Sequence, residues 1–157
     1  MTAADIIKLI RDQLEPYVAT KQGSVSIAKD PFHVLELLLL TPDGFLVVVH
    51  FAGDDDLGQS RYTGVIKLKL EVFVSQQRGL AAEPGSELVG PTEGEDPLYV
   101  LIAKVRAFIR TIEFPDDGTT SGTIWYKGSE PVAGPEGATF NAYRLRFEIN
   151  GAVSEET

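Results

Sequence analysis

Three consecutive aspartates, Asp54, Asp55 and Asp56, form the densest group of ionisable side chains in the sequence. They stand between two apolar segments, in the stretch FAGDDDLGQSRYTG. A calcium-binding loop places its carboxylates at alternate positions, with a Gly in the middle and a bidentate Glu at its end. Here the acids are consecutive and no Glu follows at the required distance. We therefore expect no metal site and interpret the run as a solvated loop between adjacent strands.

Other residues that could carry chemistry are scarce. The chain has no cysteine, which excludes disulfides, thiolate metal sites and a Cys nucleophile. Its two histidines, His33 and His50, are too few for a three-histidine zinc site, and we place both in strands as packing or edge residues. The segment GTTSGT at 118–123 lacks the lysine of a phosphate-binding loop, and no G-x-S-x-G motif occurs. Glu36, inside an apolar segment, is expected to face a partner or a basic neighbour rather than act as an acid. We expect no cofactor and no enzymatic activity.

Basic side chains recur in pairs on two predicted strands. Lys67 and Lys69 project from one strand and Arg144 and Arg146 from another, each pair on a polar face. Two interpretations remain open, a solvated sheet face or a contact with the acids of a neighbouring subunit. Phe73, an aromatic residue on the same polar face, favours the subunit contact because aromatic residues and Arg are enriched at interfaces. No aromatic stacking platform accompanies these cations, so a DNA-binding face is disfavoured.

The bulk properties describe one acidic domain. The chain has 157 residues and a formal net charge of -9, which repels nucleic acid at long range. The N-terminal residues lack the basic region and continuous apolar core of a signal peptide. The longest apolar runs are too short to span a bilayer. We therefore expect a protein that is made without export and does not contact a membrane.

The first half of the chain predicts a helix followed by a hairpin. Apolar residues at helical spacing indicate a short helix over 3–15, which Pro16 is expected to end. A strand is predicted in PFHVLELLLL, then a TPDG turn and a return strand in GFLVVVHFAG, with or without a short extra strand in GSVSIAK.

The second half predicts three more strands and a second helix. Apolar and polar residues alternate strictly in GVIKLKLEVFVSQ, which indicates a strand with one buried face. Residues 79–96 form a long loop with five acids and no base, and Asp96 and Pro97 then favour a helix start. Two more strands follow, the first containing Trp125. The prediction is an α+β fold, a mostly antiparallel β-sheet with two α-helices packed on one face, in the order α-β-β-β-α-β-β. Residues 1–150 form a single domain and 151–157 a flexible C-terminal tail.

This succession of elements resembles the tail-terminator and tail-completion (minor tail) proteins of tailed bacteriophages. A short helix leads to a hairpin ending in FLVVVHFAG, and Arg61 precedes the long strand VIKLKLEVFVSQQRGL. An acidic loop then opens the helix DPLYVLIAKVRAFIRTIEF, before the Trp-containing strand and a final strand. The resemblance covers residues 3–150 and lies in element order rather than in one diagnostic motif, and the loop at 79–96 has no match in the family.

The resemblance implies a virion structural protein without catalysis. Members of the family form a ring, typically a hexamer, that caps the tail tube and provides the surface that joins the head. The implied partners are further copies of the chain, the major tail tube protein and a head-completion or connector protein. The implied location is the virion tail, assembled in the cytoplasm of the bacterial host. DNA passes through the ring without specific binding, so Asp54–Asp56 or the loop at 79–96 could line the channel or face the tube. The alternatives are another neck or head-tail connector ring subunit, a small ligand-binding α+β domain and, least favoured, an enzyme.

Overall fold

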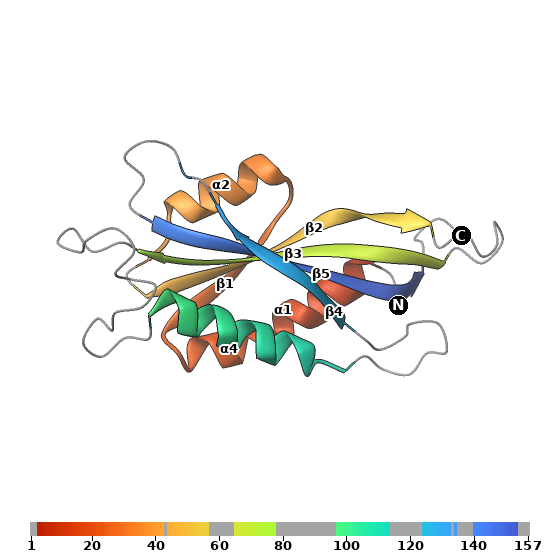
Figure 1. Cartoon of the computed structure of the whole chain (residues 1–157), viewed down its shortest axis with the longest axis horizontal. Helices are drawn as coiled ribbons and strands as arrows, with labels where there is room; N and C mark the ends of the chain where they lie inside the picture. Colours follow the sequence, from red (N-terminus) through yellow and green to blue (C-terminus); the bar gives the residue numbers. More distant parts are fainter. Residues whose placement is uncertain are drawn as a thin grey trace.

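The computed structural model describes residues 3–42, 44–56, 65–77, 97–113, 124–132, 134 and 140–153. Within these residues the chain forms a five-stranded sheet, in the order β1-β2-β3-β5-β4, and three helices (Figure 1). The helices are α1 (Ala3–Ala19), α2 (Pro31–Leu39) and α4 (Leu98–Arg110). The strands are β1 (Gly23–Ala28), β2 (Phe45–Asp56), β3 (Val65–Gln77), β4 (Ile124–Pro131) and β5 (Phe140–Val153). The predicted α+β class and the mostly antiparallel sheet are confirmed, whereas the predicted element order and the number of helices were wrong.

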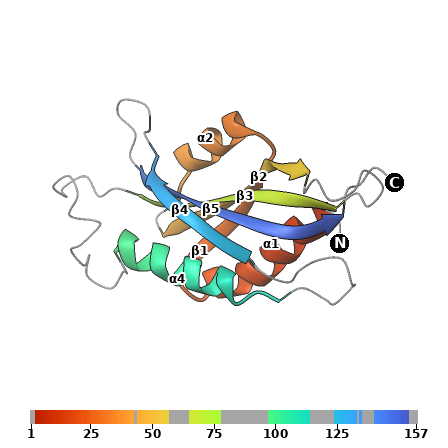
Figure 2. The same cartoon turned by 45° about the vertical axis from the view of Figure 1, so that its right-hand side comes forward.

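Helices α1 and α4 pack side by side on one face of the sheet, as both views show (Figures 1 and 2). The ring of Tyr17 on α1 stacks on Phe108 of α4, with centroids 4.3 Å apart. On the sheet side, α4 holds the edge strand β4 through Arg106, whose guanidinium lies 5.1 Å from the centre of the Tyr126 ring. The larger of the two hydrophobic clusters fills this layer and includes the fully buried Ile6, Ile10, Leu14, Val18, Leu98, Ile109, Leu145 and Ile149.

Helix α1 is longer than the sequence predicted, because it continues through Pro16 to Ala19. Proline removes one intrahelical hydrogen bond and crowds the preceding turn. The turn beyond it is stabilised by burial, since Val18 is fully buried and Tyr17 stacks on α4. Tertiary packing therefore outweighs the local cost of the proline.

Helix α2 covers part of the opposite face, where the sequence predicted a strand. Asp30 caps its first turn by accepting a hydrogen bond from the backbone N–H of His33 at 2.8 Å, and Pro31 occupies the first turn. The inward side of α2 contributes Val34 and Leu38 to a second hydrophobic cluster, which also contains Ala28, Leu46, Val48, Phe73, Phe140 and Ala142. Both histidines were predicted in strands, and this was correct for His50 on β2 but wrong for His33 on α2.

Because α2 separates them, β1 and β2 are neighbours that run parallel, with Gly23 opposite Phe45 and Ala28 opposite His50. The predicted hairpin through the TPDG turn is therefore wrong. Instead, Thr41 anchors the end of α2 to the sheet: its hydroxyl donates to the carbonyl of Leu38 at 2.6 Å and lies 2.7 Å from the Ser75 hydroxyl.

Several boundaries differ from the prediction. Pro97 is the N-cap of α4 rather than its first residue, and Asp96 lies outside the described residues. Strand β5 extends to Val153, into the segment predicted as a tail. The acidic loop at 79–96 and residues 154–157 also lie outside the described residues. Among the described helices, none has the length and apolar character needed to cross a membrane.

Candidate functional site

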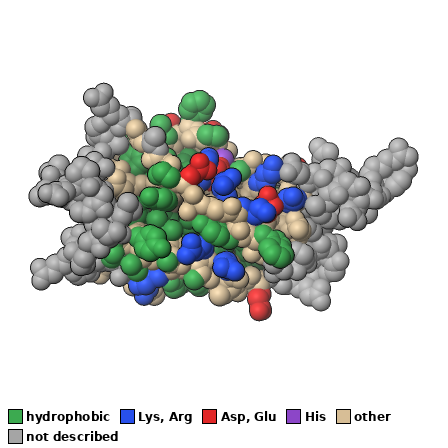
Figure 3. Space-filling view, in the orientation of Figure 1, with side chains coloured by type: hydrophobic (Ala, Val, Ile, Leu, Met, Phe, Trp, Pro, Cys, Tyr) green, Lys and Arg blue, Asp and Glu red, His purple; other side chains and the backbone are tan. Residues whose placement is uncertain are grey.

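The sheet face that carries α2 is divided into a covered half and a charged half. On the charged half, charged side chains from β3, β4 and β5 point away from α1 and α4 and lie beside α2 (Figure 3). We call this surface the charged half-face and define it by the described side chains of Lys67, Lys69, Glu71, Lys127, Glu130, Arg144, Arg146 and Glu148. The long strands β2, β3 and β5 extend beyond α2 and so create this surface.

A row of paired charges crosses the sheet at the border with α2. On β2, the ring Nδ1 of His50 lies 3.0 Å from Oε1 of Glu71 on β3. The other oxygen of Glu71 lies 3.0 Å from Nη1 of Arg144 on β5. Arg144 in turn donates to the carboxylate of Glu130 on the edge strand β4, with its Nε 3.1 Å from Oε1. One ionisable group from each of the four strands therefore takes part in a continuous network.

The pairing changes the protonation equilibria at the β4 end of this network. The hydrogen bond from Arg144 is the main cause that lowers the pKa of Glu130 below its ordinary value. The same hydrogen bond, together with the nearby charge of Glu71, raises the pKa of Arg144. Both Glu130 and Arg144 therefore stay ionised through the neutral pH range.

A second group of charges lies toward the other end of the strands. Glu148 on β5 lies 3.7 Å from the Nζ atom of Lys67 and 3.8 Å from that of Lys127. Arg146 reaches Glu130 only at 3.6 Å through its Nε atom. The side chains of Lys127 and Arg146 are 51% and 52% exposed. These separations are long for ion pairs, so the cations remain available to a further anion.

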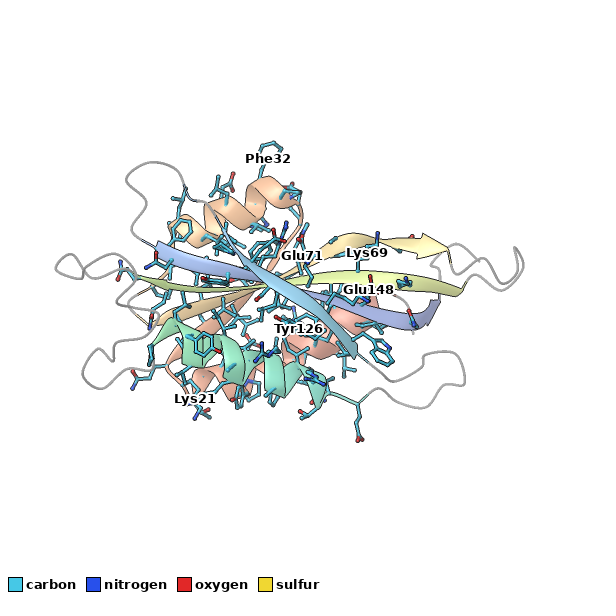
Figure 4. All side chains as sticks on the ribbon, in the orientation of Figure 1. Lys21, Phe32, Lys69, Glu71, Tyr126 and Glu148 are labelled. Carbon is cyan, nitrogen blue, oxygen red and sulfur yellow. The ribbon has the colours of Figure 1, made fainter. Side chains whose placement is uncertain are left out.

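A shallow hollow of about 220 Å³ opens within the charged half-face. It is lined by Ala52, Lys69, Leu70, Glu71, Lys127, Arg146, Phe147 and Glu148. Figure 4 shows Lys69, Glu71 and Glu148 on this part of the sheet.

Two β-bulges form the hollow. Ala52 and Lys127 are the residues that the strand registers skip, one in β2 and the other in β4. Each bulge is followed by a glycine with positive φ, 112° at Gly53 and 135° at Gly128. Bulges bend the strand and redirect side chains, and they are over-represented next to functional sites.

The second exposed feature is apolar and lies on the outward side of α2. Phe32 is 81% exposed and points away from the body of the molecule, and Leu40 is 76% exposed (Figure 4). With Leu35 and Leu39, at 37% and 49%, they form what we call the α2 ridge. The spacing of Phe32, Leu35 and Leu39 places them on one side of the helix, opposite the buried Val34 and Leu38.

The described side chains of the charged half-face form ion pairs with one another. The pair of His50 and Glu71 could in principle transfer a proton, but His50 is only 6% exposed and Arg144 neutralises the carboxylate. The described part of the chain contains no group of three or more His, Cys, Asp or Glu side chains that could hold a metal ion. The most direct chemical capacity of this surface is the binding of anions by Lys127 and Arg146.

The structure places the predicted site residues in three different environments. Lys67, Lys69, Arg144 and Arg146 share the charged half-face, where Lys67 and Arg144 face acids of the same chain. Phe73 is only 6% exposed and packs beneath α2, which explains an aromatic residue among polar ones without a partner subunit.

The three aspartates lie in β2 rather than in a loop. Asp54, Asp55 and Asp56 pair in register with Leu68, Lys67 and Ile66 of β3, and Asp54 is exposed. Glu36, also singled out from the sequence, is exposed on α2. Among the described side chains, the network around Arg144 is formed by His50, Glu71, Glu130 and Arg146.

Sequence reasoning missed Glu71, Glu130 and Glu148 as the partners of the cations. The signal was present for two of them, because strict alternation places Glu71 on the face of Lys67 and Glu148 on the face of Arg144. Glu130 and the exposed α2 ridge could not be found in this way. The first depends on the pairing of β4 with β5, and the second on recognising α2 as a helix.

Comparisons with known proteins do not assign the chain to a family. No protein-family model and no curated protein matches it. Among solved structures, the nucleotide-free catalytic domain of the histidine kinase ThkA is similar over 98% of this chain and 96% of that domain. The two share 13% sequence identity at a TM-score of 0.36, and no functional conclusion is drawn from a likeness at that level.

Proposed function

We propose that this chain is a structural subunit that assembles with copies of itself into a ring, as the tail terminator or completion protein of a tailed bacteriophage. The proposal takes its identity from the resemblance over residues 3–150, in which the long strand β3, the helix α4 and the two final strands are present, whereas the β1–α2–β2 unit replaces the hairpin. In this role the ring caps the tail tube and presents the head-joining surface. The chemistry is that of protein–protein contact, with no reaction to catalyse.

The single observation that supports assembly most strongly is the α2 ridge. Water-exposed apolar side chains are common singly, but a contiguous group of large ones marks an interaction site. Phe32 and Leu40 are 81% and 76% exposed, Leu35 and Leu39 lie beside Phe32, and the exposed Glu36 borders the group four residues from Phe32 and from Leu40. Burying such side chains against a neighbour contributes about 1.5–3 kcal/mol for each one that becomes fully buried.

The ridge alone is too small for a stable interface. A specific contact uses about 20–30 residues on each side, whereas the ridge offers four. We therefore propose that the ridge forms the apolar centre of a larger interface. The surface around the ridge would supply the rest of the contact with the next copy.

The acidic residues at the end of β2 suit a surface that meets the channel or the tube. Asp54 is exposed, and Asp54–Asp56 follow the bulge at Gly53 near the end of the strand. Negative charge facing a channel repels the phosphate backbone and allows DNA to pass without binding. Replacing Asp54–Asp56 by Asn should leave the assembled ring intact and slow DNA delivery, while normal delivery would contradict this placement.

The test of the proposed function is assembly with a ridge variant. The mass of the full chain is measured by light scattering over a range of concentrations, with negative-stain images, alone and with purified tail tubes. We expect rings, hexameric by the resemblance, in solution or at tube ends. Phe32→Ser with Leu40→Ser should abolish them because the apolar centre is lost, while circular dichroism remains unchanged.

A matched control is available on the other side of the molecule. Tyr99 on α4 is also a large exposed side chain, at 66%, so Tyr99→Ser removes an exposed aromatic ring away from the ridge and should assemble normally. A chain that stays monomeric at all concentrations and does not bind tubes would refute the proposal. Rings that bind a purified connector but not tubes would favour a neck subunit instead.

A further inference from the structure

We propose that the charged half-face binds an acidic peptide segment, namely residues 79–96 of a neighbouring copy. The inference rests on the proposed assembly of copies and names one of its contacts. It uses the half-face hollow rather than the α2 ridge. The carboxylates of the segment would lie between Lys127 and Arg146, beside the exposed ring of Trp125.

The charge distribution of the chain is the first argument. The charged half-face carries five Lys or Arg side chains and three Glu side chains among its described residues, a net charge of +2. The whole chain has 14 basic and 23 acidic residues, so the remaining nine and 20 give the rest of the chain a charge of -11. This acidic protein therefore concentrates positive charge on one surface, where it attracts acidic groups.

The geometry of the hollow is the second argument. Lys127 is directed there by the bulge in β4, and Arg146 lies on the neighbouring strand opposite Gly128. Both are about half exposed; Lys127 lies 3.8 Å from Glu148, and Arg146 lies 3.6 Å from Glu130. A carboxylate entering the hollow could make shorter contacts with both cations than they make within the chain. Trp125 is 56% exposed and is paired in register with Glu148, which lines the hollow.

The same features favour a peptide over nucleic acid. Glutamates are interspersed among the cations, with Glu148 within 3.8 Å of both Lys67 and Lys127. A phosphate backbone would have to pass these carboxylates at its regular spacing, and its affinity depends on protein cations that displace the counterions condensed on the nucleic acid. In a peptide the carboxylates can be spaced irregularly. Small uncharged residues between them can then lie opposite the glutamates of the surface, which avoids repulsion between like charges.

Residues 79–96 have the required composition. The segment GLAAEPGSELVGPTEGED carries five acids, no base, and apolar residues between them. Its charge is complementary to that of the half-face, and no Lys or Arg interrupts its acids.

The reach of the chain favours a segment from another copy. Twenty residues separate Gln77 from Leu98 and span at most about 70 Å. The end of β3 and the start of α4 lie at one end of the sheet (Figure 1), and Lys69 lies eight residues back along β3, about 27 Å away. If the segment of the same chain ran to Lys69 and back, it would use most of the length of these 20 residues. It would still have to reach α4 on the opposite face of the sheet. A neighbouring copy has no such restriction.

The test uses the full chain and a synthetic peptide of residues 79–96. In the protein, the five acids of this segment are replaced by Gln or Asn, so that its own segments do not compete with the peptide. Binding is followed by the fluorescence of Trp125, the only tryptophan, and independently by calorimetry. We expect saturable binding that weakens at high salt, because the contacts are largely exposed ion pairs.

Two matched changes test the contact from both sides. A peptide with Gln and Asn in place of its acids should bind at least about tenfold more weakly, a loss of about 1.4 kcal/mol. Lys127→Gln with Arg146→Gln should have the same effect, whereas Lys21→Gln, exposed at the end of α1 and far from the hollow (Figure 4), should not.

The outcomes separate this contact from the proposed assembly. No binding by either method, equal binding of the neutral peptide, or tighter binding of a short DNA duplex would overturn the inference. Rings that form normally without peptide binding would overturn the contact and leave the proposed function standing. Specific peptide binding by a chain that never assembles would support the recognition of an acidic segment and overturn the proposed function.

Discussion

Replacing Glu71 by Gln tests whether the row of charges across the sheet stabilises the fold. The substitution keeps the size of the side chain and removes its charge. Glu71 lies 3.0 Å from both His50 and Arg144, and its side chain is only 15% exposed. A hydrogen bond to a charged group contributes about 1.5–3 kcal/mol to stability. Because Arg144 is 35% exposed and retains Glu130, we expect a loss at the lower end, about 1.5 kcal/mol.

The loss is measured by urea unfolding at neutral pH, followed by far-UV circular dichroism. For a domain of this size it corresponds to a fall in melting temperature of about 3–6 °C. Glu15→Gln is the matched control, since Glu15 is exposed on α1 and its replacement should change stability by less than about 0.5 kcal/mol.

A double-mutant cycle isolates the contact itself. Arg144→Gln is measured alone and together with Glu71→Gln. If the two side chains interact as their 3.0 Å separation indicates, the interaction energy should be about 1 kcal/mol and exceed the additivity limit of about 0.5 kcal/mol. Additive effects would refute the reasoning, because they would mean that Glu71 stabilises the protein without Arg144.

Three further changes address the capping of α2, the packing of β1 and the edge strand β4. Asp30→Ala removes the N-cap of α2 and should cost about 1 kcal/mol in urea unfolding, whereas Asp30→Ser should restore most of it. Gly23→Ala places a methyl group 2.5 Å from the Phe45 ring, so the overpacked core should lose about 1–3 kcal/mol; an unchanged midpoint would contradict the packing. Arg144 lowers the pKa of Glu130 below 4.5, so the stability that Glu130 contributes is present above that pH and is lost as the pH falls through the lower, folded value. Glu130→Gln should therefore be less stable than the wild type at pH 7, and the difference should disappear in acid unfolding curves; a difference that persists would exclude the ion pair as its cause.

The sequence pattern predicted the strands that have one buried face, but it did not predict α2, the helix between β1 and β2. In β3 and β5, apolar and polar residues alternate because one side of each strand packs on α1 and α4. In α2 the apolar residues occur on all sides, since Val34 and Leu38 are buried while Phe32 and Leu39 form part of the ridge. A short run that is apolar throughout shows neither period clearly.

A local signal did distinguish the two possibilities at α2. Asp30 and Pro31 have the composition of a helix start, like Asp96 and Pro97 before α4. The Leu-rich composition that follows also favours a helix over a strand, which prefers β-branched residues. Misreading this segment turned a parallel pair into a hairpin and concealed the exposed ridge. The aspartates and cations of the candidate surfaces were recognised, but their acid partners depend on the register of β3, β4 and β5.

The α2 ridge can meet either itself or a different surface, and the two cases predict different assemblies. A contact of ridge with ridge is related by a two-fold axis and closes as a dimer, whereas a ring needs the ridge of one copy to meet another surface of the next. The absence of cysteine from the sequence permits a direct test with Leu39→Cys, at 49% exposure within the ridge. In a two-fold contact whose axis passes beside Leu39, the two new cysteines would lie within the Cα–Cα distance of about 7 Å that a disulfide requires, and mild oxidation would yield a covalent dimer. We expect rings that remain uncrosslinked, because each new cysteine would face a surface without one. Efficient crosslinking would show that the ridge pairs with itself, and would overturn its proposed part in the ring.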